Sequence, residues 1–340
     1  LDTNWQIGSG PYQLAEYDLN ARYLYKRFPG YRDADKGLPY IEEREYAIIV
    51  DAAAQEAAFR SEQLHIWPGN PGFTVIDPLK KDLGAKIDVD EWLSLGMFSL
   101  SLNVTKPPWN DVRAREAVYR VVSRQQYLDL LEDGKGEVCP GALPVGLSDF
   151  SVDSKQTEKH WRPDPRAARQ LLDAAGLPPD REVEMIISEG AKNSQGAQIF
   201  QQQLSQAGVT VRIVSMPFAE WRGSRVATGN WESWFSGNPA FDTPEVPLRM
   251  QHSETFTVQR FNGLKDAQVD AMIEKSEVTL DRNERIKLVQ DIQIALLEKY
   301  TPYIQLYSQT VYQPRYTFVR DYENNPSTQP MYRTAMWLDR

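Results

Sequence analysis

Three consecutive segments decide the fold class of this chain: VEMII at 183–187, IFQQQLSQAG at 199–208 and VTVRI at 209–213. The two outer segments carry apolar residues at every second position, which predicts two short strands. The apolar residues of the middle segment recur at helical spacing up to Gly208, which predicts a helix that ends there. A strand, a helix and a second strand with tight connections form a right-handed parallel crossover, so the chain is predicted to contain an α/β sheet.

Strand-like and helix-like segments alternate in a definite order around this unit. The first hundred residues favour strands at 11–17, 22–28 and 43–50, then a helix from Asp51 to residue 64, and a strand at 98–103 with one buried face. Beyond them we expect a long amphipathic helix over 111–132 and helices opened by Asp164-Pro165, by Asp266 and by the capping box of Asp281 and Glu284. Short strands are predicted at 231–235 and over 301–319. The chain begins and ends in β structure, which suggests two lobes that the chain crosses more than once.

Composition excludes several classes of protein. The 340 residues include 38 Lys+Arg and 47 Asp+Glu, a net charge of −9, so a nucleic-acid partner is not expected. No segment approaches the ~18 consecutive apolar residues of a membrane span. Cys139 is the only cysteine, which excludes an intrachain disulfide and a cysteine-based zinc site. The first residues lack both an initiator Met and the features of a signal peptide, so we expect a truncated or processed chain.

No motif in the sequence requires catalysis. His65, His160 and His252 lie far apart and form no metal-binding pattern, and there is no phosphate-binding loop, dinucleotide fingerprint or nucleophile elbow. We therefore expect neither an enzyme nor a cofactor or metal.

One aromatic cluster is the best candidate for a binding site. Trp231, Trp234 and Phe235 precede the polar loop residues Ser236 and Asn238. Aromatic faces next to hydroxyl and amide groups can stack on a small polar ligand and orient it. We interpret this segment as a ligand-binding site.

A series of short motifs, in order along nearly the whole chain, resembles the family 5 extracellular solute-binding proteins. This group includes the dipeptide-, oligopeptide- and nickel-binding components of ABC importers. The matching segments are GSGPY (8–12), FPGY (28–31), LPYI (38–41), DAAA through RSE (51–62), LN through PPWNDVR (102–113), 270–285 and PYIQLY (302–307). Each motif alone is weak, but their order is specific.

The resemblance implies a two-lobed α/β clamp of the periplasmic-binding-protein type II, in which lobe I is incomplete. Residues 1–103 and 305–340 would belong to lobe I and residues 104–304 to lobe II, with crossings at 98–103 and 302–307. Such a protein closes on a solute outside the cytoplasm, in the periplasm or anchored at the outer face of the membrane, and delivers it to ABC permease subunits. A monomer is expected.

One departure from the family bears on the solute. Peptide-binding members carry an aspartate that pairs with the α-amino group of the ligand, and here Asn238 occupies the matching position, with Asp242 a few residues later. A neutral amide forfeits the charge-assisted bond, which is about twice as strong as a neutral one. Unless Asp242 substitutes, a free peptide N-terminus is bound less well, so both the peptide class and the oligosaccharide class stay open. Trp234→Ala is expected to weaken binding.

Two other functions stay open at this point. One is a binding or regulatory module of the same fold that has no role in transport. The other is a hydrolase that uses two carboxylates brought together from distant segments, because sequence alone does not exclude such a pair.

Overall fold

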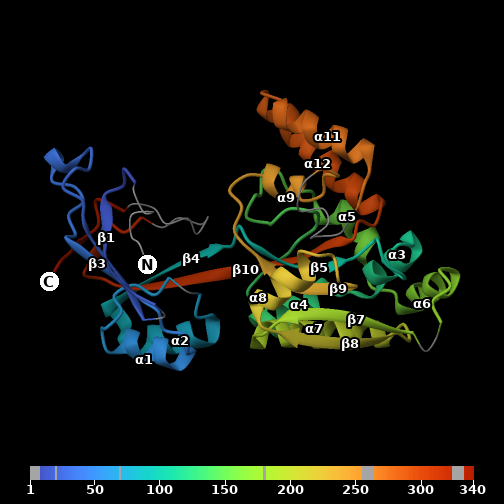
Figure 1. Cartoon of the computed structure of the whole chain (residues 1–340), viewed down its shortest axis with the longest axis horizontal. Helices are drawn as coiled ribbons and strands as arrows, with labels where there is room; N and C mark the ends of the chain where they lie inside the picture. The colour runs from blue at the N-terminus through green and yellow to red at the C-terminus, as the bar shows by residue number, and fades with distance from the viewer. Residues whose placement is uncertain (1–7, 20, 69, 179–180, 255–263, 324–332) are drawn as a thin grey trace. The chain divides into compact units, whose positions relative to one another are not determined.

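The computed structural model describes residues 8–19, 21–68, 70–178, 181–254, 264–323 and 333–340. They form two compact units (Figure 1): unit 1 comprises residues 1–92 and 311–340, and unit 2 comprises residues 93–310. The chain therefore passes from one unit to the other at 92/93 and at 310/311.

The described part of unit 1 contains small sheets, two α-helices and two short 3-10 helices. β1 (Tyr12–Asp18), β2 (Arg22–Arg27) and β3 (Glu43–Ala47) form an antiparallel sheet, followed by α1 (Ala52–Arg60), α2 (Phe73–Leu83) and β4 (Ile87–Leu93). The short strands β11 (Val319–Arg320) and β12 (Trp337–Leu338) pair near the C-terminus. As predicted, Asp51 caps α1, because its carboxylate accepts a hydrogen bond from the Ala54 amide at 2.8 Å.

Unit 2 is built on a mixed sheet. Its strands are β5 (Met97–Leu102), β6 (Gly136–Val138), β7 (Glu182–Ser188), β8 (Thr210–Met216), β9 (Ser233–Asn238) and the first part of β10 (Tyr303–Tyr316). The whole sheet has the strand order β4-β10-β5-β9-β7-β8, in which β4 up to Trp92 and the last part of β10 belong to unit 1, and β6 pairs with β10 outside this order. β7 and β8 are parallel, with Val183 opposite Val211, so the predicted crossover through α7 (Ala191–Ser205) is confirmed.

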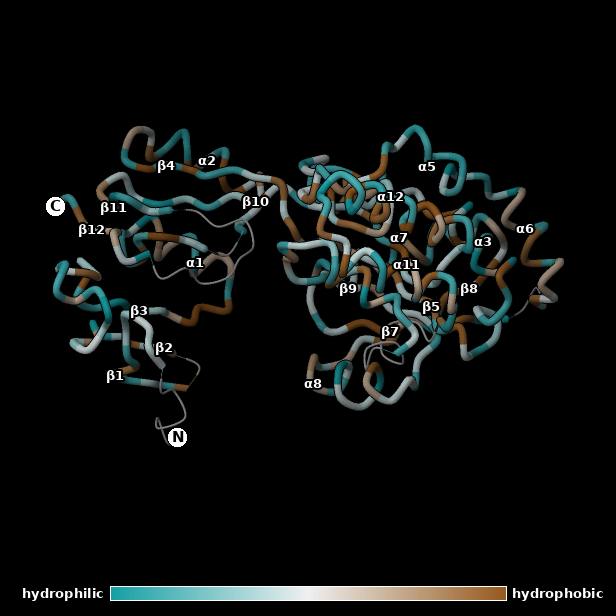
Figure 2. Tube along the Cα trace, turned by 90° about the horizontal axis from the view of Figure 1, so that it is seen from above, coloured by the Kyte–Doolittle hydropathy of each residue, from teal (hydrophilic) through white to brown (hydrophobic). Residues whose placement is uncertain are grey.

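Helices cover the sheet of unit 2 on both sides. The largest core cluster joins β5, β7, β8, β9 and β10 to α3 (Val112–Val121), α4 (Arg124–Glu132), α6 (Pro165–Ala174) and α7. A second cluster on the opposite face includes Met97, Ile186, Trp234 and Tyr303. A third joins α9 (Glu245–Arg249), α11 (Ala267–Val278) and α12 (Arg282–Glu298). The remaining helices are α5 (Ser154–Trp161), mostly hydrophilic in Figure 2, and α8 (Phe218–Glu220), which continues into a π-helical turn, Trp221–Val226.

The long helix predicted over 111–132 is wrong, because the structure has two helices there. Val122 has extended backbone angles, φ −74° and ψ 110°, and ends α3. The hydroxyl of Ser123 then accepts a hydrogen bond from the Gln126 amide at 3.2 Å and opens α4. A serine favours a helix N-cap over a helix interior, so the break occurs inside a continuous amphipathic pattern.

The strand predicted at 98–103 also needs correction. β5 has buried residues on both faces, with Ser99 and Ser101 fully buried, because the strand lies between β10 and β9 under cover from both sides. β5 and the first part of β10 both belong to the sheet of unit 2, so the segments expected to cross between lobes, 98–103 and 302–307, lie inside that unit.

Candidate functional site

The carboxyl ends of three parallel strands meet at one edge of unit 2. β9 is parallel to β7, which is parallel to β8, so their last residues Asn238, Ser188 and Met216 share this edge. Met97, the first residue of the antiparallel strand β5, lies opposite Asn238. In open α/β sheets, ligands bind outside the carboxyl ends of the strands. We define residues 188–193, 216–221 and 236–242 as the carboxyl edge.

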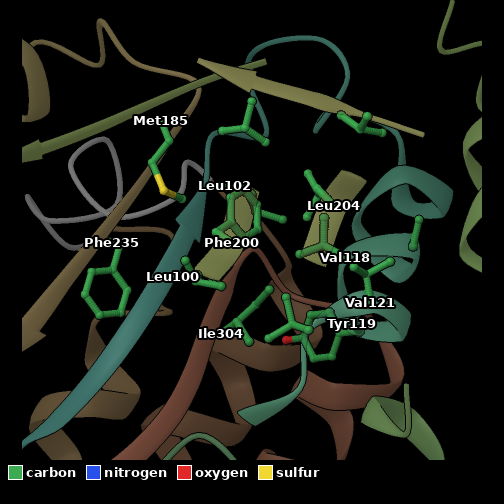
Figure 3. Close-up of a cluster of buried hydrophobic side chains, with 14 of the residues drawn as sticks. Leu100, Leu102, Val118, Tyr119, Val121, Met185, Phe200, Leu204, Phe235 and Ile304 are labelled. Atoms are coloured by element: carbon green, nitrogen blue, oxygen red, sulfur yellow. The ribbon is translucent and has the colours of Figure 1, made fainter. Parts of the chain in front are cut away.

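The three aromatic residues predicted to line a site lie inside unit 2. Trp231 and Trp234 are each 1% exposed and Phe235 is fully buried. Because neighbouring strand residues point to opposite faces, Trp234 belongs to the cluster with Tyr303 and Phe235 to the main core. Figure 3 shows Phe235 among the buried side chains of that core, with Leu100 and Met185. The structure therefore divides this cluster between two cores and offers none of its rings at the surface.

Asn238 also directs its amide nitrogen into unit 2. This nitrogen donates a hydrogen bond to the hydroxyl of Ser99 at 2.7 Å and to the carbonyl oxygen of Met97 at 3.3 Å. Tyr303 lies beside the same pair, and burial raises the pKa of its phenol well above the usual value, although the polar side chains of Ser99 and Asn238 oppose the shift. Asn238 thus links β9 to β5 and is only partly exposed.

Ser236 and Asp242 are, besides Asn238, the predicted site residues that are at least partly exposed. Ser236 is partly exposed, and its hydroxyl donates to the carbonyl oxygen of Gly237 at 3.1 Å. Asp242 is exposed, and no ion pair joins it to another residue in the part of the chain that the structure describes. A carboxylate in this position can accept hydrogen bonds from a cationic group.

Phe218 is a surface aromatic residue at the carboxyl edge that the sequence interpretation missed. It follows the end of β8 and is 59% exposed, although large hydrophobic side chains are usually buried. Its ring stacks on Trp221, with centroids 5.8 Å apart, and Trp221 packs against Trp234 at 5.9 Å. The buried tryptophans therefore support an aromatic face at the surface. The sequence signal was an aromatic residue directly after Pro217, a few residues beyond the strand predicted at 209–213.

A partly buried ion pair lies near the beginning of α7. The Glu132 side chain is only 8% exposed and accepts hydrogen bonds from Lys192 at 2.8 Å and from the Tyr307 hydroxyl at 2.8 Å. Burial and the charge of Glu132 raise the pKa of Tyr307 far above its usual range, so this phenol stays neutral and donates. The ammonium group of Lys192 also lies over the ring of Phe98, at 5.3 Å. The negative charge of Glu132 is therefore compensated by the positive charge of Lys192 within this cluster.

The residues that the structure describes contain neither a candidate metal site nor a candidate membrane helix. Within them no three His, Cys, Asp or Glu side chains gather closely enough to hold a metal ion. Likewise, none of the helices with described residues combines the length and apolar character needed to cross a bilayer.

Comparison with known proteins agrees with this architecture. The chain is 24% identical over 339 residues to the dipeptide-binding protein of Escherichia coli K12, covering 96% of this chain and 60% of that protein. The chain thus spans about 60% of the length of such relatives.

Solved structures share the fold at low sequence identity. DppA from Helicobacter pylori, in complex with the peptide STSA, superposes with a TM-score of 0.81 and 20% identity over 98% of this chain and 63% of that chain. NikA from Brucella suis, in complex with Fe(III)-EDTA, gives a TM-score of 0.76 and 19% identity over 98% and 68%. These likenesses confirm the predicted α/β fold of the periplasmic-binding-protein type II.

The family itself is identified by a model of the bacterial extracellular solute-binding proteins, family 5 (middle region), which matches residues 3–256. This is a family of binding proteins. The chain belongs to the family 5 bacterial extracellular solute-binding proteins.

Proposed function

We propose that this chain is part of the solute-binding protein of an ABC importer, which captures a peptide outside the cytoplasm as a monomer and delivers it to permease subunits. Family membership supports binding rather than catalysis. A relative named a dipeptide-binding protein and a fold neighbour solved with a peptide support the peptide class. Units 1 and 2 would correspond to lobes I and II.

The observation that carries this proposal is the chemistry of the carboxyl edge. The edge combines an exposed aromatic ring, Phe218, a hydroxyl group, Ser236, and an exposed carboxylate, Asp242, which forms no ion pair with any described residue. Because the amide nitrogen of Asn238 is engaged with Ser99, we assign the pairing with the α-amino group of the peptide to Asp242. Phe218 would contact an apolar side chain of the peptide.

The test is calorimetric titration and thermal shift of the full-length protein with dipeptides and tripeptides, N-acetylated peptides and oligosaccharides. A peptide present at about 100 times its Kd should stabilise the protein by about 2.7 kcal/mol. Asp242→Asn should weaken binding of peptides with a free amino group about 10-fold or more, because a hydrogen bond to a charged group contributes about 1.5–3 kcal/mol. It should not change the affinity for an N-acetylated peptide.

Asp291→Asn is the matched control, because Asp291 is an exposed carboxylate on α12, outside the carboxyl edge. Equal affinity of Asp242→Asn and the wild type for free peptides would refute the role of Asp242. Preference for oligosaccharides would refute the peptide class, and no shift with any compound would refute solute binding. Light scattering of the ligand-free protein tests the monomer.

A further inference from the structure

Unit 2 has a groove that is separate from the carboxyl edge. It has a volume of about 740 Å³ and is lined by β6, by the beginning of α4, by residues 145–154 and by Gln290 of α12. None of its lining residues belongs to the carboxyl edge, so the proposed function leaves it unexplained. We call it the β6 groove.

One wall of the β6 groove is the free edge of a strand. Among the described strands, β6 pairs only with β10, where Glu137 lies opposite Ser308. On either side of this pair, the Cys139 amide donates to the carbonyl oxygen of Leu306 at 2.9 Å, and the Thr310 amide donates to that of Lys135 at 3.0 Å. Residues 135, 137 and 139 therefore point their backbone groups toward β10.

The alternation of an antiparallel ladder then turns Gly136 and Val138 the other way. Their amides and carbonyls point away from β10, and both residues line the groove. Neither makes a further backbone hydrogen bond to the residues that the structure describes. Both are only partly exposed. Half-buried backbone groups of this kind are a template for another strand.

The other residues that line the groove offer both apolar surface and hydrogen-bonding groups to an extended peptide. Leu128, Val145 and Val152 contribute apolar surface, while the lining also carries the amide groups of Gln125, Gln156 and Gln290 and the hydroxyl groups of Ser148, Ser151 and Ser154. The charged side chains of the lining are the carboxylates of Glu137 and Asp153, and no basic side chain of the described residues lines the groove. An occupant with neutral or basic side chains fits this charge, and an acidic one does not.

We propose that the β6 groove binds an extended peptide segment of a partner protein, which adds a strand to β6 through the backbone groups of Gly136 and Val138. The three-residue edge spans about 10 Å at 3.3 Å per residue, so the contact takes two or three residues of a neutral or basic segment. This proposal does not depend on the solute or on the carboxyl edge.

The probe is a fluorescein-labelled peptide, acetyl-Lys-Thr-Val-Thr-Val-Lys-amide, titrated against the full-length protein by fluorescence anisotropy. Its blocked ends remove the free amino group that the carboxyl edge is proposed to use. The amide groups of an extended peptide point alternately to its two edges. Two isomers of the probe are therefore made: in one, the amides of one edge are N-methylated, and in the other, the amides of the opposite edge. One isomer should lose binding and the other should retain it.

Val138→Pro removes one outward amide hydrogen while leaving the hydrogen bonds to β10 in place. It should lower the affinity for the probe about 2- to 12-fold, which is the equivalent of one backbone hydrogen bond. Val138→Ala is the reference variant, because it also removes the valine side chain but keeps the amide, and it should bind the probe more tightly than Val138→Pro. Replacing both lysines of the probe by glutamates should weaken binding at low salt.

Four results would overturn the proposal: no binding of the probe at 1 mM, equal binding of the two N-methylated isomers, equal affinities of folded Val138→Pro and Val138→Ala, or displacement of the probe by a transported solute. The isomers decide the matter even if Val138→Pro does not fold. Failure of every solute at the carboxyl edge would refute only the proposed function.

Discussion

Gly196→Ala should destabilise unit 2, because α7 approaches the sheet too closely for a side chain at this position. A Cβ atom built on Gly196 lies 2.2, 2.5 and 2.7 Å from three ring carbons of Phe235, distances that no pair of carbon atoms tolerates. The ring has no free direction in which to move. It is fully buried and stacked on Phe98 and on Tyr127, each with centroids 5.7 Å apart.

Two opposing contributions determine the size of the effect. Overpacking of a core typically costs about 1–3 kcal/mol. Alanine in a helix interior is about 1 kcal/mol more favourable than glycine. Because three ring atoms collide and the ring is held on two sides, we expect the upper part of the overpacking range, about 2–3 kcal/mol, and therefore a net loss of about 1–2 kcal/mol. For a unit of this size, that corresponds to a fall in Tm of about 2 to 8 °C.

The assay is urea denaturation monitored by circular dichroism, together with thermal melting, for the wild type, Gly196→Ala, Phe235→Leu and the double variant. If the collision is the cause, the smaller leucine makes room for the new methyl group, and the double variant should be at least 0.5 kcal/mol more stable than additivity predicts. Gly223→Ala is the matched control, because no atom lies within 4 Å of its added Cβ. It should not destabilise the protein. An unchanged stability of Gly196→Ala, or additivity in the double variant, would refute the reasoning.

Three further predictions concern unit 2. Ser123→Ala removes the hydrogen-bond acceptor of the Gln126 amide and should lower the free energy of unfolding, measured by urea denaturation, by about 1 kcal/mol. An unchanged free energy of unfolding would show that the break between α3 and α4 does not need this cap. Asn103→Ala should cost about 1–3 kcal/mol, because the buried carbonyl oxygen of Trp231 loses its donor at 2.9 Å, while Asn103→Asp tests the same site with the shape kept. Burial raises the pKa of the Cys139 thiol to about 12. The unfolded chain ionises at lower pH and binds fewer protons there, so stability should fall between about pH 9 and 12, by at most about 1.4 kcal/mol per pH unit from this group, and Cys139→Ala should remove that part of the slope.

Local patterns in the sequence predicted the elements whose stability is local. Asp164 accepts a hydrogen bond from the Ala167 amide and Asp281 accepts one from the Glu284 amide, as their positions before apolar periodic runs indicated. The period-two runs at 183–187 and 209–213 became a parallel pair. These features need only neighbouring residues and a hydrophobic face, so a single sequence contains enough information to predict them.

The candidate site was harder to predict, because burial depends on which elements cover each face of a strand. Trp234 and Phe235 are adjacent in sequence, yet they enter different cores, since β9 is covered on both sides. Asn238 was predicted in a loop after the strand, whereas it is the last residue of β9. Its bond to Ser99 depends on pairing between segments 139 residues apart. No local pattern reports such a pairing.

The sequence by itself determined the α/β class, most helix starts and the family, because periodicity, capping residues and ordered motifs are local. Only the tertiary structure decided which side chains reach the surface of unit 2. It buried the predicted tryptophans, exposed Phe218 and Asp242 at the carboxyl edge, and left Gly136 and Val138 on a free strand edge. The physical reason is that exposure and strand pairing arise from contacts between distant segments, which form only when the sheet assembles.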